Sequence, residues 1–200
     1  MKHSGSFWVA GLSLVALLLL PTTLQAQQGV GFRFTGGWQG ISGDFGNVLD
    51  GHYDAEFSMV YAFSGIRLGA GASWVSFAMD TVDETWDQNK SHFLVAYPFG
   101  LGSSVRAYVE GRLTYRRLRP EGTRYTEHTE ELLGDFVASG TGFEAVAGAE
   151  IPFGRHWALD LSGAFGRFAT DVDLSSQGLG SIDSGSTWRL HAGVVVFPTN

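Results

Sequence analysis

The chain has 200 residues, a formal net charge of −7 and no cysteine. The lack of cysteine excludes a disulfide framework and thiolate metal ligation, and the acidic balance argues against nucleic acid as a partner. Glycine occurs 28 times and aromatic residues make up 14% of the chain, which favours many strands and turns over a helical bundle.

Residues 1–26 predict a signal peptide. Lys2 supplies a positive start, and Val9 to Leu20 is an apolar run of about twelve residues, too short to span a bilayer as a helix. Pro21 ends the run, and cleavage is expected before Gln27. We therefore expect residues 27–200 to form the mature domain, with export through the periplasm.

Eight segments of the mature chain alternate between apolar and polar residues with a period of two, which indicates strands with two different faces. These segments are 29–40, 52–63, 65–77, 91–99, 104–118, 140–151, 156–168 and 187–197. The clearest is 104–118, in which one face runs from Val105 to Tyr115 and the other contains Arg106, Glu110 and Arg112.

The connections between these segments alternate in length. The short connections are 64–65, 100–104 and 152–155, and the long connections are 41–51, 78–90, 119–139 and 169–186. Short turns on one rim and long loops on the other are typical of outer-membrane barrels, whose short turns are periplasmic. The sequence therefore predicts an all-β fold, an eight-stranded antiparallel up-and-down transmembrane β-barrel with long extracellular loops.

Aromatic residues lie near the strand ends on the apolar face, as expected for belts at the two membrane interfaces. The predicted aromatic girdle consists of Trp38, Tyr53, Tyr61, Trp74, Tyr97, Tyr115, Trp157 and Trp188.

The polar face is expected to point inward, because each arginine facing lipid near the bilayer midplane would cost about 2–4 kcal/mol. The predicted interior charges are six basic and six acidic residues: Arg33, Arg67, Arg106, Arg112, Arg116 and Arg189, and Asp54, Glu56, Glu110, Glu144, Glu150 and Asp160. This balanced set predicts a structural ion-pair network that fills a narrow lumen and leaves no wide pore. The inward glycines Gly69, Gly71, Gly148 and Gly193 are expected to leave room for the arginines.

This arrangement of segments resembles the small outer-membrane barrel family typified by OmpX and the barrel domain of OmpA. The resemblance implies an eight-stranded barrel and a terminal aromatic residue read by the barrel-assembly machinery. Phe197 is out of phase with the apolar set from Trp188 to Val196 and is followed by three residues. Either a bulge restores its phase or the terminal signal is imperfect.

Two groups of residues resemble parts of known chemical sites. Ser91 and His92, with an acid such as Glu84, are the components of a lipid-hydrolysing triad, but no recognisable motif surrounds them. Asp171, Asp173 and Ser175 fit the start of a calcium loop, but Ser176 and Ile182 stand where glycine and glutamate are required.

A loop rich in acidic residues could bridge divalent cations to lipopolysaccharide, although simple solvation explains it better; its acids are Asp80, Asp83, Glu84 and Asp87. We expect no catalytic, cofactor-binding or metal site.

The leading hypothesis is a monomeric, non-enzymatic outer-membrane protein that serves envelope integrity or surface interaction through its loops. Its expected partners are outer-membrane lipid, lipopolysaccharide, the barrel-assembly machinery and a loop ligand that the sequence does not identify. One alternative is an outer-membrane enzyme acting on lipid A or peptide. Another is a soluble lipocalin-like carrier, in which the apolar face would point inward and hold a hydrophobic ligand.

Overall fold

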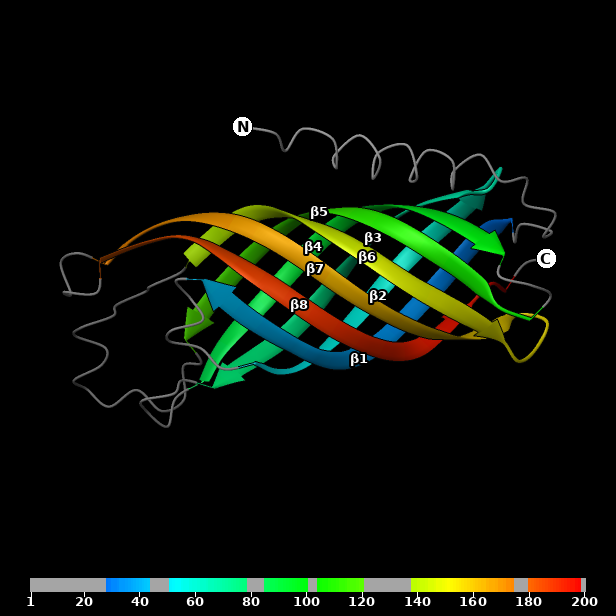
Figure 1. The fold of residues 1–200 in the computed structure, drawn as a ribbon, viewed down its shortest axis with the longest axis horizontal. Helices are drawn as coiled ribbons and strands as arrows, with labels where there is room; N and C mark the ends of the chain where they lie inside the picture. Colours follow the sequence, from blue (N-terminus) through cyan, green and yellow to red (C-terminus); the bar gives the residue numbers. More distant parts are fainter. Residues whose placement is uncertain are drawn as a thin grey trace, which may run out of the picture.

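A computed structural model describes residues 28–43, 51–78, 85–100, 104–120, 138–174 and 180–198. It contains eight strands: β1 (Gly29–Gly43), β2 (His52–Phe63), β3 (Ile66–Ala78), β4 (Thr85–Gly100), β5 (Arg106–Pro120), β6 (Ala138–Pro152), β7 (Trp157–Leu174) and β8 (Gly180–Val196). Each strand pairs antiparallel with the next, and β8 pairs with β1 (Figure 1). The predicted eight-stranded up-and-down barrel is confirmed.

The two rims of the barrel differ in their connections. The short-turn rim holds the connections β2–β3, β4–β5 and β6–β7, together with the start of β1 and the end of β8, and the long-loop rim holds the other four connections (Figure 1). The β2–β3 turn consists of Ser64 and Gly65 with φ values of 46° and 81°. Two successive left-handed residues match the twist of a two-residue hairpin and explain this tight connection.

Three strands extend by six or seven residues further toward the long-loop rim than the sequence pattern predicts. β4 begins at Thr85 instead of residue 91, β7 continues to Leu174, and β8 begins at Gly180. The sequence from 85 to 90, TWDQNK, is mostly polar on both faces, so it carries no apolar alternation. Its backbone nevertheless pairs with β3 and β5, and the connections 79–84 and 175–179 are correspondingly shorter than expected.

The register fixes the shape of the barrel. A path perpendicular to the strands starts at residue 30 of β1 and returns to β1 at residue 40, a stagger of ten residues. The strands are therefore tilted, and neighbouring strands are offset by about 1.3 residues at equal height. With eight strands the interior is just wide enough to be filled by side chains.

The two faces of the strands differ in burial as well as in chemistry. On β2, Tyr53 and Met59 are 69% and 51% exposed on the outside, whereas the intervening Glu56 and Ser58 are 5% and 0% exposed. No helix within the described residues is long and apolar enough to cross a membrane. The outer surface of the barrel is thus apolar and the interior polar, which is the reverse of a lipocalin-like carrier.

The eight predicted girdle residues all lie on the outer surface. Trp38 and Tyr53 are directly opposite each other on β1 and β2, and their rings form an edge-to-face pair with centroids 5.1 Å apart. Seven of the eight are between 38% and 69% exposed, and Tyr97 is half-buried.

Phe197 does not return to the lipid-facing set. The ladder of β8 with β1 runs without a shift to Val196, and the Phe197 ring points into the barrel, where it is fully buried. Its backbone N–H donates to the carbonyl of His156, and its ring lies 5.1 Å from the Arg67 guanidinium. No bulge restores the phase of Phe197, which closes the interior instead of joining the outer aromatic belt.

Apolar side chains occupy both ends of the interior. Near the short-turn rim a buried cluster comprises Val60, Ala62, Leu94, Ala96, Ala158, Val195 and Phe197. Toward the long-loop rim the buried side chains of Val75, Phe77, Leu118 and Phe168 are at most 3% exposed. Glu144 and its partners therefore lie between two apolar layers, whereas Arg67 lies within the layer near the short-turn rim, directly opposite Ala62 and Ala96.

The Phe197 ring makes a testable contact with β1. A Cβ added at Gly31 would lie 2.5 Å from this ring, so Gly31→Ala should displace Phe197. Overpacking of this kind costs about 1–3 kcal/mol, and the urea midpoint of unfolding in detergent should fall accordingly. Gly154→Ala is the matched control, because the nearest atom to its added Cβ is 3.9 Å away. Equal midpoints for the two variants would contradict the packing of Phe197 described above.

Candidate functional site in the barrel interior

The twelve charged residues of the polar face all point into the barrel. Eleven of them are at most 5% exposed, and the Arg106 side chain is 12% exposed. They come from seven strands, β1, β2, β3, β5, β6, β7 and β8, and meet because the alternation turns each toward the same axis.

Glu144 of β6 is the centre of the network. Its carboxylate oxygens lie 3.0 Å from Lys90 Nζ, 2.6 Å from Arg116 Nη2 and 2.5 Å from Arg189 Nη2. Arg112 Nη1 is a fourth cation at 3.8 Å. One carboxylate thus joins cations from β4, β5 and β8.

Glu56 and Glu110 extend the network across the barrel. Glu56 Oε2 accepts from Arg112 Nη1 at 2.6 Å and from Arg189 Nη1 at 2.7 Å. Arg33 donates to both oxygens of Glu110, at 3.0 and 2.9 Å, and Arg112 also pairs with Glu110. Arg112 therefore bridges carboxylates of β2 and β5.

A second group of charges lies toward the short-turn rim. Arg67 of β3 binds Glu150 of β6 through both guanidinium nitrogens, and Arg106 Nε is 3.6 Å from the same carboxylate. Tyr108 donates its hydroxyl to Asp160 Oδ2 at 2.9 Å. Glu150 and Asp160 therefore each accept a hydrogen bond from a protein side chain.

Two histidines belong to the same interior. His191 Nε2 is 2.5 Å from Asp54 Oδ1, and its Nδ1 is 3.1 Å from Thr35 Oγ1. His92 Nε2 is 3.1 Å from Ser58 Oγ. The His191 ring therefore connects Asp54 of β2 with Thr35 of β1, and the His92 ring bonds to Ser58.

Lys90 was missed by the sequence pattern. The pattern places it in the loop 78–90, but it lies on β4 in phase with His92, is 1% exposed and pairs with Glu144. The charges in the inward phase among the described residues are therefore seven basic and six acidic, not six and six; Asp87, which is also buried, has the phase of the outward residues Asn89 and Ser91. The spacing of two residues between Lys90 and His92 is the signal that could have placed it inside.

The inward glycines make room for side chains other than arginine. A Cβ at Gly148 would lie 2.5 Å from the Tyr108 ring, and a Cβ at Gly71 would lie 2.7 Å from the His92 ring. Those at Gly69 and Gly193 would approach backbone of the neighbouring strand. Gly166, which the pattern did not single out, makes room for Glu144.

Ser91 and His92 do not form a catalytic pair. Ser91 is exposed on the outer face of β4, whereas His92 is 3% exposed inside the barrel. Adjacent residues of a strand point to opposite faces, so the Ser91 hydroxyl faces away from the imidazole. Asp87, which the sequence pattern places in the acidic loop, lies on β4 and is buried. Glu84 and the acidic-loop residues Asp80 and Asp83 lie outside the described residues, as do the side chains of Asp171, Asp173 and Ser175 and the whole of residues 1–26.

Most of the interior charges lie in ion pairs that join different strands. Buried charges are tolerated when each is paired and hydrogen-bonded, and removal of one partner leaves an uncompensated charge. Apolar layers lie on either side of Glu144 and its partners along the barrel axis, and the Arg67–Glu150 pair lies within the layer near the short-turn rim. Chemically, the interior can hold the strands at fixed separation through ion pairs that join strands far apart around the barrel.

Comparison with known proteins yields structural neighbours only. No protein-family model matches the chain, and no curated protein sequence matches it. The crystal structure of Neisserial surface protein A, NspA, is similar with a TM-score of 0.66 and 15% identity, over 84% of this chain and 97% of NspA. The N-terminal β-barrel domain of Pseudomonas aeruginosa OprF has a TM-score of 0.51 and 16% identity, over 86% of this chain and 98% of that domain.

At these identities the likeness shows the fold, which is that of the small eight-stranded transmembrane barrels. The resemblance seen in the strand pattern is confirmed at this level.

The central carboxylate provides the most direct test of the network. Glu144→Gln leaves four buried cations around a neutral amide, and we expect it to lower the free energy of unfolding by about 3–5 kcal/mol. Urea unfolding of the refolded protein, followed by tryptophan fluorescence, measures the change.

Lys90→Met added to Glu144→Gln is the control, because it removes one of the cations left unpaired. The double variant should recover part of the loss. A Glu144→Gln protein within about 0.5 kcal/mol of wild type, the range of ordinary surface substitutions, would contradict the central position of Glu144.

Proposed function

We propose that this chain is a non-enzymatic outer-membrane protein, exported through the periplasm, whose long loops face the outside. In this proposal it serves envelope integrity or surface interaction, and its lumen is filled by the charge network and forms no wide pore. The observation that carries the proposal is the combination of an apolar outer surface with an interior closed by ion pairs and apolar layers.

The role of the interior follows from its connectivity. Arg189 on β8 reaches Glu56 on β2 and Glu144 on β6, so a single guanidinium links three strands. Side chains held in this way support a rigid barrel on which loops can vary without loss of the fold. Binding is therefore assigned to the loops and the lipid surface, and the interior to stability.

The proposed partners follow from the same surfaces. The apolar outer face fits outer-membrane lipid, including lipopolysaccharide, and the barrel-assembly machinery is the expected route of insertion. The negative net charge disfavours nucleic acid. We propose that the protein acts as a monomer, because the closed barrel leaves each described strand paired on both sides.

Cell fractionation tests the compartment and the orientation. The protein should be recovered with the outer membrane, and its unboiled form should migrate differently from its boiled form on a denaturing gel. External protease on intact cells should cut only in the long-loop connections, with the connection 121–137 the longest target. Recovery of the mature protein in a detergent-free soluble fraction would overturn the proposal.

Planar-bilayer recording tests the filled lumen. The purified protein should give no conductance steps above baseline, because the charge network and the two apolar layers occupy the interior. A general porin prepared in the same detergent is the positive control. Regular conductance steps of porin size would contradict the filled interior while leaving the fold unaffected.

A further inference from the structure

One sector of the outer surface departs from the apolar pattern. Near the long-loop rim, strands β4 to β7 carry exposed polar side chains on the lipid-facing side: Asn89, Ser91, Arg117, Ser139, Thr141 and Arg167. We call this set the outer polar patch. It contains two arginines and no acidic residue, although the whole chain has a net charge of −7.

The register brings the two arginines to nearly the same height. Arg117 of β5 is opposite Ser139 of β6, and Arg167 of β7 is opposite Phe143, four residues further along β6. Because neighbouring strands are offset by about 1.3 residues at equal height, the two steps from β5 to β7 account for most of these four residues. The arginines therefore flank Thr141 on the strand between them, two strands apart around the barrel.

The arginines lie just beyond the aromatic belt. Arg117 follows Tyr115 by two residues on the same face of β5, and Arg167 follows Phe165 in the same way on β7. Tyr115 and Phe165 are 52% and 57% exposed to the outside. A side chain one pleat, about 7 Å, beyond an interfacial tyrosine reaches the depth of lipid headgroups.

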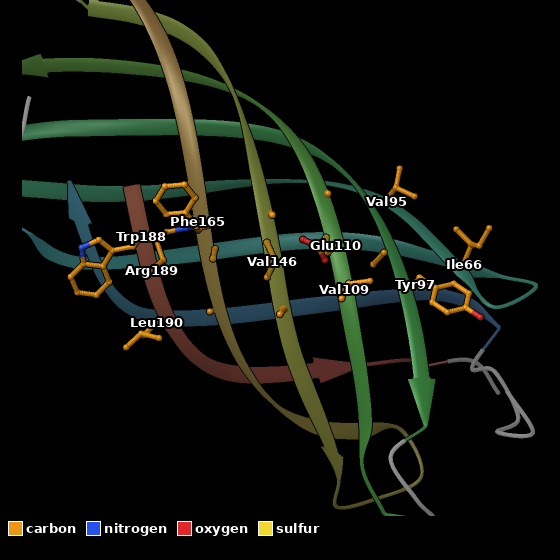
Figure 2. Close-up of a pocket in the computed structure, with 16 residues that line it drawn as sticks. Ile66, Val95, Tyr97, Val109, Glu110, Val146, Phe165, Trp188, Arg189 and Leu190 are labelled. Atoms are coloured by element: carbon orange, nitrogen blue, oxygen red, sulfur yellow. The ribbon is translucent and has the colours of Figure 1, made fainter. Parts of the chain in front are cut away.

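A hollow of about 900 Å³ lies on the outer surface below the outer polar patch. Small and aliphatic side chains of β5 to β8 form much of its lining: Val109, Gly111, Ala145, Ala147, Gly163 and Leu190. Figure 2 shows Trp188, Phe165 and Leu190 at one end of the hollow and Val95, Ile66 and Tyr97 at the other. Phe165 lies at the end of the hollow nearer the long-loop rim, and it therefore connects the hollow to Arg167 on the same face of β7.

We propose that the outer polar patch and this hollow form a binding site for a phosphorylated lipid of the outer leaflet, with lipopolysaccharide as the occupant. Arg117 and Arg167 bind the headgroup phosphate, and acyl chains lie in the hollow. This inference rests on the proposed outer-membrane location and names the lipid that the barrel selects there.

Two physical arguments favour this occupant. Guanidinium groups hydrogen-bond phosphate through two nitrogens, and such charge-assisted bonds are among the strongest that a protein surface offers. An apolar hollow in a lipid-facing surface must be filled by hydrocarbon, because water there would have no polar partners. A phosphate between two arginines above several acyl chains satisfies both conditions, whereas a second copy of this chain would bring its own arginines against them.

Native mass spectrometry of the detergent-solubilised mature protein, titrated with bisphosphorylated lipid A, tests the site. Arg117→Gln/Arg167→Gln should bind this lipid about tenfold more weakly, a change that corresponds to about 1.4 kcal/mol. Arg155→Gln is the matched control, because Arg155 is an exposed arginine near the short-turn rim. Wild type should bind dephosphorylated lipid A about as weakly as the double variant binds the phosphorylated form.

Gly163→Leu tests the hollow separately. A Cβ at Gly163 makes only ordinary contacts, the nearest at 3.6 Å from Leu190, so the variant should fold and show the same gel shift as wild type. It should weaken binding of phosphorylated and dephosphorylated lipid A alike, because it fills space that acyl chains need.

Three results would overturn the lipid site. The first is equal affinity of the double arginine variant and Arg155→Gln. The second is equal affinity of wild type for the phosphorylated and dephosphorylated lipids. The third is a protein dimer that Gly163→Leu abolishes, which would assign the hollow to a second copy of the chain. None of these results changes where the protein fractionates, so failure of the lipid site is separable from failure of the proposed location.

Discussion

The rest of the structure depends on one constraint, which is that a chain surrounded by hydrocarbon must satisfy its own polar groups. Backbone N–H and C=O groups meet this condition by pairing around a closed barrel. The charged side chains meet it by turning inward, where Glu144 alone contacts Lys90, Arg116 and Arg189 within 3.0 Å. The same alternation that exposes apolar side chains to lipid therefore also gathers the charges.

The geometry of the barrel and the network depend on each other. Eight strands with a stagger of ten residues enclose a space that side chains can fill, and long arginines reach across it. Arg189 on β8 and Glu56 on β2 are separated by β1, yet their side chains meet at 2.7 Å. Glycines at particular places, such as Gly148 beside Tyr108 and Gly166 beside Glu144, allow the larger groups to fit.

Much of this fold could be predicted from the sequence, because lipid on one side and charge on the other impose a period of two. The predicted strand bounds were wrong where a strand extends past the lipid, because nothing there requires alternation of apolar and polar residues. Beyond the membrane both faces of a strand can be polar, so the first six residues of β4, with Lys90 as the sixth, were assigned to a loop. For the same reason the pattern predicts too early an end for β7 and too late a beginning for β8.

Two further features needed coordinates because sequence phase alone does not describe them. Phe197 keeps the inward phase of Val195, but its ring contact with Arg67 and its bond to the His156 carbonyl, past the last ladder pair at Val196, could not be read from that phase. The ion-pair partners of each carboxylate depend on the relative heights of strands that are not neighbours. The residue pattern of a single strand does not contain this information. Ser91 and His92 are the opposite case, because strand alternation alone already separates them.

The most direct test of the account is solid-state NMR of the labelled protein in lipid bilayers, with magnetisation transferred either from acyl chains or from water. We expect transfer from acyl chains to the outward residues Leu113 and Ala145, and little transfer from either source to their inward neighbours Thr114 and Val146, which are 5% and 4% exposed. Water transfer to Thr114 and Val146 as strong as that to the connecting loops would contradict a filled, charge-paired interior.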